Sequence, residues 1–202
     1  MIHICDNFFS DPYKVRSIAF KGKYICAYNY PGLRSDNVPK EVNDEILSYI
    51  RYITKNSSLK FYDSSFQSIS QEYDEGIYHM DPGHTYICII YLSLDPPLNS
   101  GTEICDSDHV RGLEIFNSIN PKVMKSRDLF HKDPSNLINR YRYGRMRKKV
   151  NSFYKPNIIA ANKFNRCVIF PATNFHRAQN FFGTSLGNSR LTIVSFMDKH
   201  GI

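Results

Sequence analysis

Near the amino terminus, apolar residues follow a helical period after one short strand. The stretch from Ile4 to Phe9 predicts the strand. Ser10-Asp11-Pro12 then supplies a capping residue and a first-turn proline, which predict a helix. A second helix is predicted to begin within Asp36–Pro39. The apolar positions after it fall on one stripe, which we expect to pack against a sheet: Val42, Ile46, Leu47, Ile50 and Ile53.

From Phe66 onward the spacing becomes that of strands. Phe66–Tyr73 alternates between apolar and polar residues, and Thr85–Leu94 is a nearly continuous apolar run. The turn sequence Asp95-Pro96-Pro97-Leu98-Asn99-Ser100-Gly101 separates that run from a short strand. The remaining predicted strands are Gly101–Cys105, Ile158–Ala161, Arg166–Pro171, Phe175–Asn180 and Leu191–Met197.

Residues 106–154 interrupt the strands with mixed polar and basic sequence. Asp133-Pro134-Ser135-Asn136 predicts a further helix start within this insertion. Because about 50 residues barely sustain a core of their own, we interpret 106–154 as a lid or binding element. The whole chain, 1–202, is then one α+β domain, mainly β, whose sheet closes into a barrel-like sandwich with the first helices packed on it.

Composition narrows the cellular setting. The five cysteines are odd in number and scattered, which favours reduced thiols over a disulfide framework. No apolar stretch approaches the roughly 20 residues that span a membrane. The sequence from Met1 to Asp6 lacks a basic region followed by an apolar one, so no signal peptide is expected. These features predict a cytoplasmic protein with no membrane partner.

The net charge of +7 is unevenly distributed, because Arg140–Lys149 alone contributes six cations. Interleaved tyrosines in this basic run could stack on bases while the cations bind phosphates. The alternative interpretation is a solvated helix face. The sequence carries no signature of base readout, so nucleic acid remains a candidate partner on charge alone.

The candidate chemistry lies in His79, Asp81 and His176. If His79-Met80-Asp81 forms one strand, its alternation places the imidazole and the carboxylate on the same face. A distant second histidine, His176, completes a two-histidine, one-carboxylate set typical of non-haem Fe(II) oxygenases, with open positions for other ligands. A single buried histidine is usually a core residue, and we interpret three others in that way: His84, His109 and His131.

Arg190 opens the last predicted strand and supplies a second chemical indication. Alternation puts Arg190, Thr192, Val194 and Phe196 on one face. A polar pair at the end of an inward face is costly unless an anion meets it. A guanidinium fork with a neighbouring hydroxyl suits the distal end of a dicarboxylic acid.

These residues occur within segments that resemble the Fe(II)- and 2-oxoglutarate-dependent dioxygenases, and among them the prolyl-4-hydroxylase-like branch. The order of the matching pieces follows the family over most of the chain, whereas residues 106–154 have no counterpart that we can place. The matching segments are Asp6–Ser10, Gln71–Asp81, Ile90–Ser93, Gly101–Glu103 and Asn165–Pro171, followed by His176 and Arg190.

The resemblance implies a double-stranded β-helix of the jelly-roll or cupin-like type. His79, Asp81 and His176 would bind Fe(II), and Arg190 would bind the far carboxylate of 2-oxoglutarate. Thr192 or a tyrosine would assist, with Tyr73 favoured over Tyr86 and Tyr91. Many prolyl-hydroxylase relatives carry lysine at the Arg190 position, which leaves the substrate subgroup open.

The implied activity uses O2 and 2-oxoglutarate to hydroxylate a substrate, or to demethylate it through an unstable hydroxymethyl group. Asp81 disfavours halogenation, because halogenating relatives have a small residue there. A protein or peptide side chain, an amino acid and another small molecule all remain candidate substrates. The alternatives are a nucleic-acid-directed oxidative demethylase that uses the basic run, and a non-catalytic cupin-like binding protein. Iron-dependent succinate production distinguishes the enzymes from the binding protein.

Overall fold

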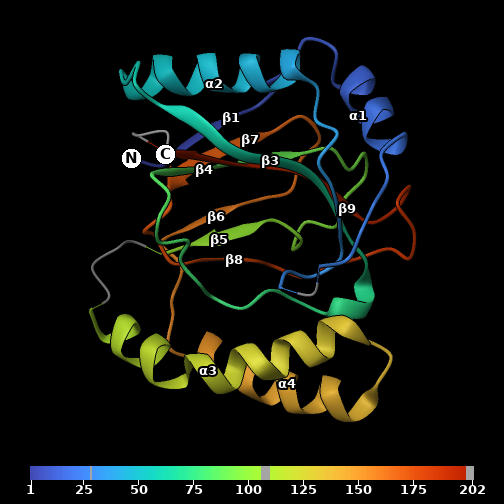
Figure 1. The fold of residues 1–202 in the computed structure, drawn as a ribbon, viewed down its shortest axis with the longest axis vertical. Helices are drawn as coiled ribbons and strands as arrows, with labels where there is room; N and C mark the ends of the chain where they lie inside the picture. The colour runs from blue at the N-terminus through green and yellow to red at the C-terminus, as the bar shows by residue number, and fades with distance from the viewer. Residues whose placement is uncertain (28, 106–109, 199–202) are drawn as a thin grey trace.

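The protein contains two antiparallel sheets that face each other between helical layers (Figure 1). This computed structural model describes residues 1–27, 29–105 and 110–198, and the side chains of all of these except 110–120. The larger sheet has the order β1-β7-β4-β9-β3-β2 and the smaller one β6-β5-β8. The strands are β1 His3–Cys5, β2 Leu33–Ser35, β3 Lys60–Ile69, β4 Tyr86–Tyr91, β5 Thr102–Ile104, β6 Ile158–Ala160, β7 Cys167–Pro171, β8 His176–Ala178 and β9 Arg190–Asp198.

Two amino-terminal helices cover the outer face of the larger sheet, as predicted. In α1 (Pro12–Phe20), the Asp11 side chain caps the first turn by accepting a hydrogen bond from the Lys14 amide at 3.0 Å. In α2 (Lys40–Thr54), the apolar stripe packs into a core that includes strand residues of the sheet below it. The predicted packing of both helices is therefore confirmed.

A second core fills the space between the two sheets. It joins Ile87, Ile89 and Tyr91 of β4 to Ile104 and Ala160 of the smaller sheet. Along the chain, β4, β7 and β9 belong to the larger sheet, while β5, β6 and β8 belong to the smaller one. Apart from β5 and β6, which follow each other in the smaller sheet, successive strands from β4 onward change sheet, as in a double-stranded β-helix, and part of the inner face of the larger sheet lines a cavity.

Some predicted boundaries were wrong. β3 begins at Lys60 rather than Phe66, because Ser64 and Ser65 pair with β9 although they break the apolar alternation. It ends at Ile69, and Tyr73 lies in a short 3-10 turn, η1 (Gln71–Tyr73). The first strand stops at Cys5, shortly before Asn7, whose φ of +56° is incompatible with an extended strand.

The region predicted as an insertion contains two helices that lie side by side beyond the smaller sheet (Figure 1). They are α3 (Val110–Lys132) and α4 (Leu137–Asn151). The predicted helix start is confirmed, since the Asn136 side chain accepts hydrogen bonds from the amides of Ile138 and Asn139 at 3.1 Å. Phe130 of α3 stacks on Tyr143 of α4, so the two helices share an apolar contact.

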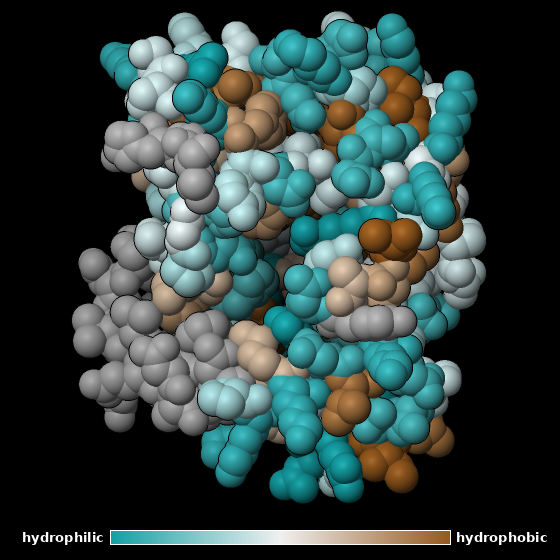
Figure 2. Space-filling model, viewed as in Figure 1, coloured by the Kyte–Doolittle hydropathy of each residue, from teal (hydrophilic) through white to brown (hydrophobic). Residues whose placement is uncertain are grey.

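Hydrophilic side chains dominate the surface over α2 at the top of the molecule, with isolated hydrophobic residues among them (Figure 2). Within the ranges that the structure describes, no helix has the length and hydrophobicity that crossing a bilayer demands.

Candidate functional site

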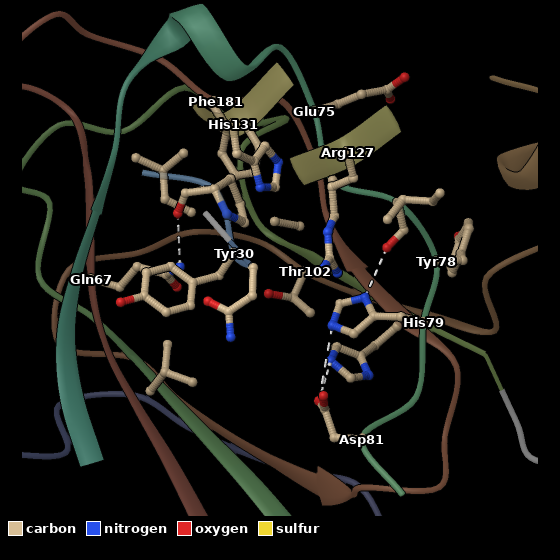
Figure 3. A pocket seen from close by; sticks show the side chains of 18 of the residues that line it. Tyr30, Gln67, Glu75, Tyr78, His79, Asp81, Thr102, Arg127, His131 and Phe181 are labelled. Carbon is tan, nitrogen blue, oxygen red and sulfur yellow. Dashed lines mark hydrogen bonds and ion pairs between the residues drawn. The ribbon is translucent and has the colours of Figure 1, made fainter. Parts of the chain in front are cut away.

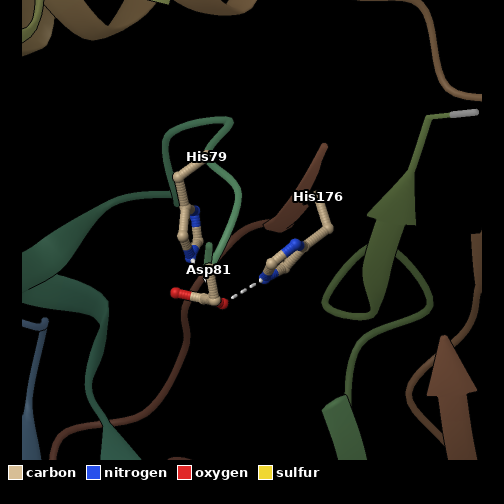
Figure 4. Close-up of side chains that lie close together, drawn as sticks. All are labelled: His79, Asp81 and His176. Atoms are coloured by element: carbon tan, nitrogen blue, oxygen red, sulfur yellow. Dashed lines mark ion pairs between the residues drawn. The ribbon is translucent and has the colours of Figure 1, made fainter. Parts of the chain in front are cut away.

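His79, Asp81 and His176 converge at one point between the sheets (Figure 4). Oδ2 of Asp81 lies 3.4 Å from Nε2 of His176 and 3.9 Å from Nε2 of His79. One nitrogen or oxygen atom from each residue lies within 4.8 Å of the others. The structure thus brings together the three residues that the sequence singled out.

The main chain holds the two histidines beside each other. The amide of His79 donates to the carbonyl of His176 at 3.1 Å, and the amide of His176 donates back at 2.9 Å. Asp81 leaves this pairing, because its amide donates to the Ala172 carbonyl at 3.0 Å. The prediction that His79 and Asp81 lie on one strand was therefore wrong: His79 forms an isolated bridge and Asp81 lies in the following loop.

Both imidazoles are fixed in the tautomer that a metal needs. Nδ1 of His79 lies 2.8 Å from the carbonyl oxygen of Ile77, and Nδ1 of His176 lies 3.0 Å from that of Asn174. A carbonyl oxygen can only accept, so each Nδ1 carries the hydrogen and each Nε2 of a neutral ring keeps its lone pair. Burial, followed by the neighbouring His176, lowers the pKa of His79 and favours its neutral form.

Asp81 supplies the negative charge of this group. Burial by itself would raise the pKa of Asp81, but its interactions with the adjacent rings of His176 and His79 outweigh it. The net effect holds the pKa below its usual range, so Asp81 is a carboxylate at neutral pH. Two neutral imidazoles and one carboxylate form a donor set that fits Fe(II) and other divalent first-row metals.

Glu103 of β5 ties together the two segments that carry the histidines. Its Oε2 accepts hydrogen bonds of 2.6 Å from the Tyr78 hydroxyl and from Nε of Arg177. Tyr78 immediately precedes His79, and Arg177 immediately follows His176. Glu103 is therefore placed to fix the spacing of the histidines without touching them.

A cavity of about 330 Å³ opens in front of the three residues (Figure 3). The inner face of the larger sheet forms one wall, and α3 contributes another through Val123, Met124 and Arg127. Further side chains at the wall are Tyr30, Arg34, Gln67, Tyr78, Thr102, His131, Arg190 and Phe196. The three residues thus lie at a cavity that is bounded by the larger sheet and by α3.

Arg190, which the sequence predicted to meet an anion, lines this cavity and is only 2% exposed. It donates to the Ser100 carbonyl at 3.2 Å and to the Thr102 hydroxyl at 3.3 Å, and its guanidinium lies 5.3 Å from the centre of the Tyr91 ring. No carboxylate of the described residues lies within 4 Å of it. Burial lowers the pKa of Arg190, which reflects the cost of a buried cation that lacks an anionic partner.

Thr192 and Tyr73, the two residues predicted to assist Arg190, lie in different surroundings. Thr192 is fully buried, and its Oγ1 has no hydrogen-bond partner among the described residues, but it does not line the cavity. Tyr73 packs against the rings of Phe130 and His131. Tyr91 and Thr102 are the hydroxyl-bearing residues beside Arg190.

The other predicted histidines are separate from the three converging residues. Nδ1 of His84 lies 3.1 Å from Oδ1 of Asp198. His131 lines the cavity from α3 and is not part of the group that could hold a metal. His109 lies outside the described residues.

Sequence reasoning did not identify several polar residues of the cavity wall, namely Tyr30, Arg34, Gln67 and Arg127. Tyr30 and Arg34 lie in a stretch where no element was predicted. Arg127 belongs to the region without a counterpart in the resemblance. The face of Gln67 could have been read from the alternation of its strand, because Gln67 and Ile69 both line the cavity.

The basic run Arg140–Lys149 lies on α4 and is divided between two environments. Arg147 is 4% exposed and forms ion pairs with Asp74 at 3.3 Å and Glu75 at 3.5 Å. Arg140 also pairs with Asp74. The remaining cations are exposed: Arg142, Arg145, Lys148 and Lys149. Part of the run therefore fastens α4 to the segment that precedes His79.

Comparisons with models of protein families and with curated protein sequences found no match. Solved structures do match over almost the whole chain. HygX from Streptomyces hygroscopicus, with nickel and 2-oxoglutarate bound, has a TM-score of 0.61 at 10% identity, covering 98% of this chain and 82% of HygX.

A 2OG-Fe(II) oxygenase family protein from Burkholderia pseudomallei has a TM-score of 0.59 at 8% identity, with 98% and 84% of the two chains covered. A Pseudomonas putida prolyl-4-hydroxylase has a TM-score of 0.51 at 12% identity, with 99% and 93% covered. The chain thus has the fold of the 2-oxoglutarate- and Fe(II)-dependent oxygenases, in agreement with the resemblance in its sequence.

Proposed function

We propose that this protein is an Fe(II)- and 2-oxoglutarate-dependent dioxygenase that hydroxylates its substrate. The observation that carries the proposal is a single cavity with two features on its walls. His79, His176 and Asp81 present two imidazoles and one carboxylate, and Arg190 presents a buried guanidinium without an anionic partner among the described residues. A site for a divalent metal and a dianion needs both.

His79, Asp81 and His176 would hold the metal, leaving its remaining positions toward the cavity. With O2, the bound iron and 2-oxoglutarate supply the oxidising chemistry, which yields succinate, CO2 and a hydroxylated product. The carbonyls of Ile77 and Asn174 keep both imidazoles in the metal-binding tautomer. Asp81 is present as a carboxylate, which favours hydroxylation over halogenation.

Arg190 would bind and orient the far carboxylate of 2-oxoglutarate. Thr102 and Tyr91 contact its guanidinium and hold it in place, so the guanidinium needs little rearrangement to bind the carboxylate. The side chains of α3 exclude bulk water from the same space, which strengthens electrostatic interactions inside it.

The size of the cavity bears on the substrate. About 330 Å³ is at the low end of the range of roughly 300–1,000 Å³ for small-molecule sites. Once 2-oxoglutarate occupies part of it, the remaining space suits an amino acid, another small molecule or one side chain of a peptide. The exposed cations of α4 are the feature that supports a nucleic acid substrate, and they lie outside this cavity.

The test is Fe(II)-dependent conversion of 2-oxoglutarate to succinate under O2, combined with a screen of substrate pools for a mass gain of one oxygen. We expect His79→Ala, Asp81→Ala and His176→Ala each to reduce succinate formation to background, because each removes a metal ligand. His84→Ala is the matched control and should retain activity, since His84 pairs with Asp198 outside the metal-binding group. Wild-type activity in any of the first three variants would remove that residue from the site.

A further inference from the structure

Arg34 is a second arginine in the cavity, and it lies on the wall formed by the larger sheet. It belongs to β2, directly opposite Gln67 of β3, so both side chains occupy the same face. The centre of its guanidinium lies 4.0 Å from the centre of the Tyr30 ring. This stacking fixes the plane of the guanidinium at the cavity wall.

Arg34 forms no ion pair with any residue that the structure describes. Its Nε is buried and makes no hydrogen bond with the described residues, and none of their carboxylates lies within 4 Å of it. The acids that line the cavity are engaged elsewhere. Asp81 belongs to the metal-binding group, and Glu75 pairs with Arg177 at 2.5 Å and with Arg147 at 3.5 Å. Arg34 is partly buried, and a cation in this situation is costly unless a ligand compensates it.

The charges of the proposed active site do not provide that compensation. The two charges of Fe(II) and the one of Arg190 balance the carboxylate of Asp81 and the dianion 2-oxoglutarate. Arg34 therefore remains as a positive charge without an ion pair to the described residues after the metal and the co-substrate have bound, although Asp63 and Asp81 attract it from a distance. Arg127 adds to it, since Figure 3 shows its side chain extending from α3 toward His79, although Asp128 neutralises it in part at 2.8 Å.

We propose that Arg34, with Tyr30 stacked on it, is a second anion-binding group of this cavity and holds an acidic group of the primary substrate. This assignment rests on the proposed function. The substrate is then a small molecule that carries a carboxylate or a phosphate group, both of which match the planar guanidinium fork. Arg127, which extends toward His79, adds to the positive potential of the cavity.

The experiment measures binding of two probe anions, acetate and inorganic phosphate, by isothermal titration calorimetry at constant ionic strength. The sample is the full chain loaded with Ni(II), which does not turn over, and saturated with 2-oxoglutarate so that Arg190 is occupied. We expect at least one probe to bind the wild type and to lose tenfold or more in affinity in Arg34→Met. Tighter acetate binding indicates a carboxylate substrate, and tighter phosphate binding indicates a phosphate-bearing one.

Two further variants keep the result interpretable. Arg34→Lys retains the charge without the fork and should keep part of the affinity. Arg142→Met removes an exposed cation of α4 and should bind the probes as the wild type does. Arg34→Met should melt close to the wild type without ligands, because Arg34 is partly buried and forms no ion pair with the described residues.

The inference is overturned if neither probe binds the wild type, or if Arg34→Met binds both as tightly. Titration of 2-oxoglutarate into the same Ni(II)-loaded protein distinguishes a failure of the proposed function from a failure of the role of Arg34. Absence of 2-oxoglutarate binding contradicts the proposed function, whereas normal 2-oxoglutarate binding without probe binding contradicts the role of Arg34 alone.

Discussion

Arg190 is positively charged at a position that is almost closed to solvent, and its protein partners are neutral oxygens and an aromatic ring. Hydrogen bonds to neutral groups orient a guanidinium but do not cancel its charge. The guanidinium of Arg190 is thus oriented for a ligand whose carboxylate supplies the missing negative charge. Arg147 is similarly buried, but its charge is neutralised, because Asp74 and Glu75 lie within ion-pair distance.

We predict that Arg190→Ala weakens 2-oxoglutarate binding by about 10- to 150-fold, because a hydrogen bond to a charged group contributes roughly 1.5–3 kcal/mol. Ni(II) affinity should be unchanged, since Arg190 is not among the metal-binding residues. The 2-oxoglutarate affinity of Arg190→Lys should lie between those of the wild type and Arg190→Ala, because lysine keeps the charge and loses the bidentate fork. Calorimetric titration measures both affinities, and unaltered 2-oxoglutarate binding in Arg190→Ala would assign the anchor to another cation of the cavity.

At the level of elements, α4 is attached to the segment that leads into His79. Arg147 reaches from the helix to Asp74 and Glu75 and also donates to the Tyr73 carbonyl at 3.2 Å. The backbone between Glu75 and His79 in turn pairs with the region of β8. The position of His79, one of the three residues proposed to hold the metal, therefore depends on a helix that the sequence marked as an insertion.

We predict that Arg147→Ala lowers the free energy of unfolding by about 3–5 kcal/mol, the usual cost of leaving buried charges without their partner. Arg140→Ala is the matched control, because it removes an ion pair to the same Asp74 from a side chain that is 41% exposed. Its cost should be at most about 1 kcal/mol. Urea unfolding measures both, and equal losses in the two variants would contradict the structural role of Arg147.

The elements that the sequence predicted well are those with local signals. Asp11 and Asn136 cap their helices through hydrogen bonds within three residues, so their positions can be read from the chain. The start of β3 could not be read from the local sequence, because Ser64 and Ser65 are held by pairing with β9, which is far away in the sequence. Tertiary pairing overrode the local apolar pattern there.

The same distinction applies to the site. Residue type and order were enough to single out His79, Asp81, His176 and Arg190. The preference for Tyr73 beside Arg190 has no support in its position, since the neighbours of an arginine at a strand end depend on strand register. That register places Tyr91 opposite Thr192 and brings Thr102 to the guanidinium.

In the whole molecule, the proposed metal and 2-oxoglutarate would contact both sheets at once. His176 opens β8 of the smaller sheet, whereas Arg190 opens β9 of the larger one. His79 and Asp81 lie in the segment that leads into β4. A metal and a dianion bound between them would connect parts of the chain that are otherwise joined through the inner core.

We predict that Ni(II) and 2-oxoglutarate stabilise the entire fold against heat. A ligand at 100 times its dissociation constant adds about 2.7 kcal/mol, which corresponds to a rise in Tm of roughly 5–10 °C for a chain of this size. A chelator should reverse the effect of the metal. In His176→Ala the metal-induced rise should disappear, and an undiminished rise would show that the metal binds elsewhere.

The paired peptide hydrogen bonds between residues 79 and 176 make the chain a starting point for redesign. These backbone hydrogen bonds do not involve the side chain of residue 81, so we expect the two histidines to stay adjacent when that side chain is exchanged. Glutamate, cysteine or glycine introduced there would each meet the same bis-imidazole pair and differ only in the softness and number of the donors offered. One scaffold could in this way be tuned across the first-row transition series.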